Sequence, residues 1–161
     1  MVYITIKLRF YLFYFEKEAN EIKYKSKNQQ KKIDEINANF ENFRKIGVHI
    51  RRTDNEWAIK NSPEELFFDA ISKEIAHDNN CKIYLATDDN SLKKVFKDRF
   101  SEKVITNDNC VIERTSIEGM RQGVVDLFLL ATSNIIYGSF WSSFSEEAAK
   151  IGKCELKIIK K

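Results

Sequence analysis

The sequence lacks the features of several common protein classes. Its three cysteines, Cys81, Cys110 and Cys154, are odd in number and widely spaced, and they form no CxxC pair. This pattern fits neither a disulfide framework nor a zinc site, and it favours a reducing, cytoplasmic compartment. Internal repeats and low-complexity tracts are also absent.

Charge of one sign is not in large excess. Twenty-seven lysine and arginine residues oppose 24 acidic residues, which gives a net charge of +3. This excess is too small for a protein that binds by neutralising many phosphates, so no nucleic-acid partner is expected. With 161 residues, 43% of them hydrophobic, the chain has the size and composition of one globular domain with a buried core.

The first fifteen residues are hydrophobic but too few to span a membrane, which takes roughly 20 mostly apolar residues. Lys7 and Arg9 interrupt them and no small-residue cleavage site follows, which argues against a signal peptide. Apolar and polar residues alternate from Val2 to Leu12, the pattern of a strand with one buried face. The aromatic residues in this stretch leave association with a membrane surface as an alternative.

The composition changes between Lys17 and Lys32, where lysine, glutamate, asparagine and glutamine dominate. Such a stretch is typical of a solvated helix or a linker. Apolar residues at positions 33, 36, 40 and 43 then recur at helical spacing and predict a helix. We therefore divide the chain into residues 1–44, a strand, linker and lead-in helix, and residues 45–161, a single domain.

Short apolar strands alternate with helices in the second part. The predicted strands are 46–50, 82–87, 103–106, 134–137 and 155–159. The predicted helices begin at Pro63, at Ser91 as N-cap, near Met120 and at Phe144, and the third of them is apolar on nearly every side. This alternation over more than 100 residues predicts an α/β fold with a doubly wound, mostly parallel sheet of the Rossmann-like type.

Polar residues gather after three of the predicted strands. The three clusters are 49–54 (HIRRTD), 87–89 (TDD) and 138–145 (GSFWSSFS). Ligands of parallel α/β sheets bind beyond the carboxyl ends of the strands. The sequence therefore predicts a binding site at that edge.

Arg51 and Arg52 directly follow a buried strand, where a guanidinium group without an anionic partner is costly. Their planar forks suit the two phosphates of a nucleoside diphosphate. His49 precedes them, and Asp54 is near enough in sequence to orient one of them. A surface arginine–aspartate pair is the alternative.

The third cluster lies at the start of a predicted helix. Ser143 and Glu146 have the S-x-x-E spacing of a capping box. Free backbone N–H groups and the positive end of the helix dipole near Ser142 and Ser143 suit a phosphate. A helix cap with no ligand is the alternative.

Asp126 interrupts the apolar run 124–130 and needs a partner there. The two adjacent N–H donors of a guanine base would supply one, and a wet helix face or an internal arginine would be alternatives.

Asp88 and Asp89 have no third ligand at a spacing suited to magnesium, and such a pair more often caps the following helix. Trp57 and Trp141 could stack on a ring, although core packing is the default expectation for tryptophan.

In order and spacing, these clusters resemble the superfamily of α-1,6-, α-1,2- and protein O-fucosyltransferases, nearest to the α-1,6 branch that includes rhizobial nodulation fucosyltransferases. The resemblance rests on 46–54 (IGVHIRRTD), 84–89 (YLATDD), Asp126 and 139–143 (SFWSS). It implies a GT-B-like enzyme of two Rossmann-type domains, of which this chain would carry the C-terminal, GDP-fucose-binding one.

The resemblance further implies transfer of fucose from GDP-fucose to a glycan or other hydroxyl acceptor, with inversion and without a metal or other cofactor. Arg51 would contact the diphosphate, and its loss would abolish transfer. The resemblance places His49 and Arg52 beside Arg51, and it implies that Asp54 supports the first loop. Asp88 and Asp89 would support the second loop. Asp126 would contact the guanine, and Ser142 or Ser143 would contact the phosphates.

Two features depart from the family pattern. The α-1,6 enzymes carry a glutamate as candidate base after the arginines, whereas here 57–60 has no carboxylate and Glu56 is the nearest substitute. Residues 1–44 are too few for an acceptor domain, so the enzyme is truncated or is completed by a partner subunit or a second copy. A non-catalytic module that holds GDP or a GDP-sugar is the main alternative, and a basic module for RNA or anionic lipid is another.

Overall fold

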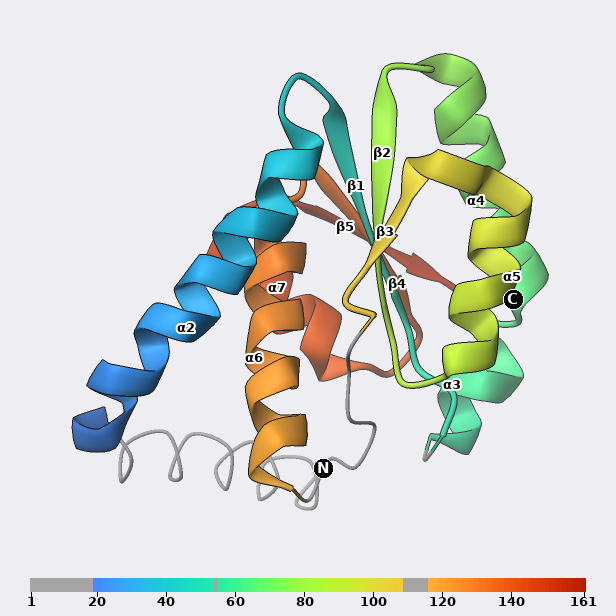
Figure 1. Cartoon of the computed structure of the whole chain (residues 1–161). Coiled ribbons are helices and arrows are strands. Elements are labelled where there is room, and N and C mark those ends of the chain that lie inside the picture. Colours follow the sequence, from blue (N-terminus) through green and yellow to red (C-terminus); the bar gives the residue numbers. More distant parts are fainter. Residues whose placement is uncertain (1–18, 54, 109–115) are drawn as a thin grey trace.

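A five-stranded parallel sheet forms the centre of the protein. The computed structural model describes residues 19–53, 55–108 and 116–161, with side chains from residue 27 onward (Figure 1). The strands are β1 (Arg44–Ile50), β2 (Cys81–Thr87), β3 (Val104–Thr106), β4 (Ile135–Ser139) and β5 (Glu155–Ile159). All neighbours are parallel, in the order β3-β2-β1-β4-β5. The predicted α/β fold is confirmed, whereas the strand predicted at 2–12 lies outside the described residues.

Helices cover both faces of the sheet, as the doubly wound prediction requires (Figure 1). One face carries α2 (Ala19–Asn37), with the short 3₁₀ turn η1 (Ala38–Phe40), α6 (Ile117–Ala131) and α7 (Ser143–Gly152). The other carries α3 (Glu56–Asn61), α4 (Glu64–His77) and α5 (Asn90–Phe100), which a second 3₁₀ turn, η2 (Ser101–Lys103), follows. The core is therefore two apolar layers, one on each side of the sheet.

Strand alternation decides which face each side chain of β1 meets. Ile46, Val48 and Ile50 pack with α4 and α5, whereas Lys45 and His49 lie on the opposite side, toward α2, α6 and α7. His49 is consequently buried beneath α7 although it belongs to a polar cluster.

Two elements differ from the prediction beyond their ends. β4 continues through Gly138 and Ser139, because these residues pair with the neighbouring strands. The prediction ends this strand at residue 137. The helix α3 was not predicted, and it is capped by Asn55, whose side chain accepts a hydrogen bond from the N–H of Ala58 at 3.0 Å.

The caps predicted at Ser91 and Ser143 are wrong by one or two residues, whereas the expectation that the Asp88–Asp89 pair caps the following helix is confirmed at Asp89. Asp89, not Ser91, is the N-cap of α5. The N-cap of α7 is Ser142, so Ser143 lies inside the helix and the predicted capping box with Glu146 does not form. In both cases the helix starts where the chain leaves the sheet edge, which the spacing of polar residues does not reveal.

α2 packs against α6 on the same face of the sheet. Ile33 is buried in the core layer of that face, and the Lys32 ammonium donates to Gln122 Oε1 at 2.9 Å. The division of the chain at 44/45 stays a prediction. In the described part of the chain, no helix combines the length and the apolar character that a membrane span requires.

Candidate functional site

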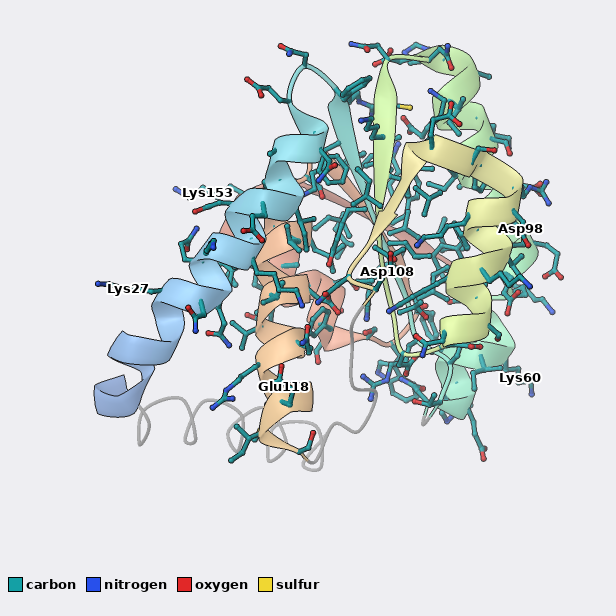
Figure 2. All side chains as sticks on the ribbon, in the orientation of Figure 1. Lys27, Lys60, Asp98, Asp108, Glu118 and Lys153 are labelled. Atoms are coloured by element: carbon teal, nitrogen blue, oxygen red, sulfur yellow. The ribbon has the colours of Figure 1, made fainter. Side chains whose placement is uncertain are left out.

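The three predicted polar clusters meet at the carboxyl edge of the sheet, which is the lower edge in Figure 1. β1, β2 and β4 are neighbours and parallel, so the loops that follow them converge. In Figure 2, the label Lys60 marks α3 and the label Asp108 marks the residue that follows Asn107 after β3.

His49 lies near the end of β1 and directly beneath the first turn of α7. Its Nδ1 is 3.4 Å from the hydroxyl oxygen of Ser142, and its ring centre is 4.8 Å from that of Phe144. Ser142 is the N-cap by position, but its side chain makes no capping hydrogen bond. The hydroxyl faces His49 instead, so the histidine and the amino end of α7 form one structural unit.

Arg51 joins the loops that follow β1, β2 and β4. Its backbone N–H donates to Ser139 Oγ at 3.1 Å, and its Nε lies 3.8 Å from Asp88 Oδ2. The side chain is 24% exposed. Arg51 thus combines a fixed backbone with a guanidinium that is partly open to solvent.

Arg52 points into the protein. Its Nη2 donates to the carbonyl of Ser62 at 2.9 Å, its Nη1 donates to the carbonyl of Arg51 at 3.0 Å, and its Nε lies 3.4 Å from Glu64 Oε1. The side chain is 9% exposed. These bonds make Arg52 a support of the loop, and its predicted contact with a ligand stays a prediction.

Asp88 ties the first loop to the second. Its Oδ1 accepts from the N–H of Arg52 at 2.7 Å, and its Oδ2 accepts from the N–H of Thr53 at 3.2 Å and from the Thr53 hydroxyl at 2.7 Å. Three donors on one loop therefore converge on a carboxylate that is 5% exposed. Asp88 fixes the course of the chain next to Arg51.

Asp89, its neighbour, caps α5. It accepts from the backbone N–H groups of Ser91 and Leu92 and from the Ser91 hydroxyl. The Ser91 hydroxyl and these N–H groups hold the pKa of Asp89 below its usual value, although partial burial acts the other way. The helix-capping alternative is what the structure shows for this residue.

Asp126 has internal partners that the sequence did not reveal. Its Oδ1 accepts from the Tyr84 hydroxyl at 2.6 Å and from Asn107 Nδ2 at 3.3 Å. Burial raises the pKa of Asp126. Because Asn107 directly follows β3, Asp126 lies near the carboxyl edge, on the α6 side of the sheet. Its predicted contact with guanine stays a prediction.

Two side chains outside the predicted set hold these loops together. The buried Ser62 hydroxyl donates to the carbonyl of Ile159 at 2.6 Å and accepts from the N–H of Phe140 at 2.7 Å. Asn55 Nδ2 donates to the carbonyl of Trp141 at 3.0 Å. The helix start predicted at Pro63 marks the position of Ser62 but not its partners, and nothing in the sequence links Asn55 to Trp141.

Trp57 and Trp141 are exposed, so the expectation of core packing is wrong for both. Their exposed fractions are 59% and 55%, and their rings meet edge to face with centres 5.5 Å apart. They stand beside the site because α3 and the β4–α7 connection leave the same edge of the sheet.

Asp54 lies outside the described residues. Among the residues that are described, no group of three or more histidine, cysteine or acidic side chains is placed to hold a metal ion. Two shallow grooves in the described part lie between α2 and α6 and beside η1 and the start of β1.

No protein-family model matches the chain, and no curated protein matches it by sequence. Solved structures do match its fold. The NodZ α-1,6-fucosyltransferase co-crystallised with GDP is 21% identical with a TM-score of 0.55, and the match covers 76% of this chain and 40% of that one. The fucosyltransferase NodZ from Bradyrhizobium is 22% identical with a TM-score of 0.54, covering 75% and 40%.

POFUT1 in complex with GDP-fucose matches with a TM-score of 0.58 at 8% identity, covering 82% of this chain and 46% of that one. The chain therefore spans less than half the length of these structures. Its fold is the Rossmann-like α/β fold that it shares with part of these fucosyltransferases.

Proposed function

We propose that this chain is the donor-binding domain of a fucosyltransferase. It binds GDP-fucose at the carboxyl edge of the sheet and serves inverting, metal-independent transfer of fucose to a glycan or other hydroxyl acceptor. Several of the structures that share its fold were solved with GDP or GDP-fucose, which supports this choice of ligand. The residues at the edge provide the chemistry.

The observation that carries the proposal is the contact of β1 with the amino end of α7. His49 Nδ1 lies 3.4 Å from Ser142 Oγ, and the N–H of Arg51 donates to Ser139 Oγ. The first-turn N–H groups of α7 and the positive end of its dipole attract an anion, and a guanidinium two residues after His49 adds a fixed positive charge. We assign the diphosphate to this position, between Arg51 and Ser142–Ser143.

Arg51 has the central role in transfer. Negative charge grows on the diphosphate as the bond to fucose breaks, and the sugar passes through an oxocarbenium-like transition state. A preorganised guanidinium stabilises that charge without reorganising during the reaction. Asp88 and Arg52 act as positioning residues, because their bonds fix the loop that carries Arg51.

We assign Asp126 to the guanine. Both hydrogen bonds described for this carboxylate end on Oδ1, so Oδ2 is the oxygen that would accept from the base. Glu56, exposed in the first turn of α3, is the carboxylate that we assign as the base for the acceptor hydroxyl. It directly precedes Trp57 in the sequence.

Calorimetric titration tests the donor site. We expect GDP and GDP-fucose to bind in the presence of EDTA, and UDP to bind at least tenfold more weakly, because only guanine offers paired N–H donors to Asp126. Equal affinity for UDP would remove the guanine assignment. Absence of GDP binding would overturn the donor site itself.

A non-catalytic module that holds GDP or a GDP-sugar is the second candidate. The observation that favours it is the lack of a carboxylate at residues 57–60, where the α-1,6 enzymes carry a candidate base. Release of fucose from GDP-fucose, measured by chromatography of the products, distinguishes the two. An enzyme that is completed by a partner subunit or a second copy would show transfer only after that partner is added.

A further inference from the structure

Trp57 and Trp141 form an exposed corner next to the donor edge. Their ring planes are nearly perpendicular, at 81°, with centres 5.5 Å apart, so a ligand that lies on the face of one indole would contact the other indole at its side. Each side chain is more than half exposed. Single exposed apolar side chains are common on protein surfaces, whereas two large aromatic rings exposed in contact with each other form a contiguous patch of the kind that binds ligands.

The corner is held rigidly by one amide. Asn55 Oδ1 accepts from the N–H of Ala58 and so starts the helix that carries Trp57, while Asn55 Nδ2 donates to the carbonyl of Trp141. Trp141 has a φ of +57°, the left-handed region that costs a bulky side chain free energy. A strained backbone kept in place by a dedicated hydrogen bond indicates that the direction of this indole matters.

The corner continues into the proposed donor site. Trp141 directly precedes Ser142, the residue that contacts His49, and Asn55 follows the arginine loop. A molecule that lies on the indoles would therefore sit next to the end of GDP-fucose that carries the sugar.

Size and chemistry favour a small amphipathic ligand over a protein. Two indoles at these exposures offer roughly 250 Å² of apolar surface, whereas a stable protein interface needs about 800 Å² per partner. Charged residues flank the corner, with Glu56 and Lys60 exposed on α3. A pyranose ring whose hydroxyls are equatorial has a flat face of axial C–H groups and a polar rim, which matches an aromatic floor with polar edges.

We propose that the Trp57–Trp141 corner is a stacking platform for a pyranose ring of the acceptor, which makes the acceptor a carbohydrate. This inference rests on the proposed function for the role of the sugar, although binding can be measured independently of transfer. The ring stacks on one indole, and the rim groups accept or donate hydrogen bonds to its hydroxyls.

Intrinsic fluorescence tests the platform directly, because Trp57 and Trp141 are the only two tryptophans of the chain. We use cellotetraose as the probe, since all its ring substituents are equatorial. Titration of the full chain is expected to shift or quench the tryptophan emission in a saturable manner. A parallel calorimetric titration with GDP reports on the donor site.

Variants separate the platform from general effects on folding. Trp57→Ala is expected to weaken cellotetraose binding tenfold or more, and Trp57→Phe within threefold, with GDP affinity unchanged in both. Trp141→Ala removes the other indole of the corner and is a second, independent test. Phe128→Ala removes an exposed aromatic side chain of α6, away from the corner, and is expected to change neither affinity.

Each outcome bears on the proposal. GDP binding without any cellotetraose response would overturn the platform and leave the donor site standing. A change in emission that depends on the protein concentration and not on the sugar concentration would mean that a second copy of the chain covers the corner. That result would also overturn the proposal. A saturable cellotetraose response without GDP binding would support the platform and contradict the donor site.

Discussion

Arg51 and Arg52 are neighbours in the sequence but meet different surroundings. Lysine keeps the charge of arginine and loses the planar fork. We expect Arg51→Lys to leave the melting temperature unchanged and to lower fucose transfer by about 10²-fold or more, since a fixed donor to the developing charge is lost. Turnover of GDP-fucose and thermal unfolding of the same sample measure both effects.

Arg52→Lys serves as the matched variant. Its guanidinium bonds the carbonyls of Arg51 and Ser62 and pairs with the partly exposed Glu64, and an ammonium cannot reach all three. We expect a loss of about 2 kcal/mol in the free energy of unfolding, the scale of hydrogen bonds to charged groups. If Arg51→Lys were the less stable of the two variants, the assigned roles would be reversed.

Replacement by asparagine should affect Asp88 and Asp89 differently. Asp88→Asn removes one acceptor from a carboxylate that receives three donors, so we expect a loss of about 1–3 kcal/mol in the free energy of unfolding. Asp89→Asn should be nearly neutral, because asparagine is as good an N-cap as aspartate. Urea unfolding of both variants makes the comparison, and a similar loss in both would contradict the difference in role.

At this scale the sequence identified the right residue types but not their partners. Asp126 needed a partner, as predicted, yet the partners are Tyr84 from β2 and Asn107 after β3. These residues are distant in the sequence and meet only because α6 crosses that part of the sheet. No local pattern contains this information.

The junction of β4 with α7 is the element on which the candidate site depends. A Cβ at Gly138 would lie 2.7 Å from the Cβ of Ser145 in the first turn of α7. We expect Gly138→Ala to push α7 away from His49, to lower the free energy of unfolding by about 1–3 kcal/mol and to weaken GDP binding. Denaturant unfolding and calorimetry measure the two effects.

Gly123→Ala is the control for that substitution. Gly123 lies in the middle of α6, and a Cβ there would have no neighbour within 4 Å. Alanine is the better helix former by about 1 kcal/mol, so this variant should gain stability and keep its affinity for GDP. Weaker GDP binding in both glycine variants would show that the effect is not specific to α7.

The five strands were predictable within two residues at each end, because buried parallel strands are short apolar runs between polar clusters. The short helix α3 was not predictable, because its six residues mix polar and apolar types and only the N-cap Asn55 marks its start. The sequence also does not predict which face of α6 is buried. Gln122, Val125 and Leu129 are buried, whereas Met120, Val124 and Leu127 are only partly so. A helix that is apolar all round gives no indication of which side meets the sheet.

A buried lysine at the amino edge of the sheet should make stability depend on pH. Burial lowers the pKa of Lys45 to about 7, while its ammonium donates to Asn37 and Thr132 at 2.7 Å each. The unfolded chain, with a lysine pKa near 10.4, then holds more protons between pH 7 and 10. The free energy of unfolding should therefore rise with pH in this window, by up to about 1.4 kcal/mol per unit.

Urea unfolding at pH 7 and 8.5 checks this, with Lys45→Met as the comparison. Burial raises the pKa of Cys81, so ionisation of this thiol in the unfolded chain acts in the opposite direction near pH 8.5. This effect is common to both proteins and cancels in the comparison. The variant lacks the titrating group, so its stability should change less between the two pH values than that of the wild type. Equal slopes in the two proteins would contradict a lowered pKa for Lys45.

On the scale of the whole molecule, the sequence by itself determined the α/β class, the parallel sheet and the edge where the polar clusters meet. These follow from local hydrophobic periodicity and from the geometry that all parallel sheets share. The tertiary structure alone decided that Arg51 is partly open while Arg52 is buried, that Asp88 fixes the first loop, and that two tryptophans stand exposed beside it. Those roles depend on which residues distant in the sequence become neighbours in space, and spacing along a chain does not encode that neighbourhood.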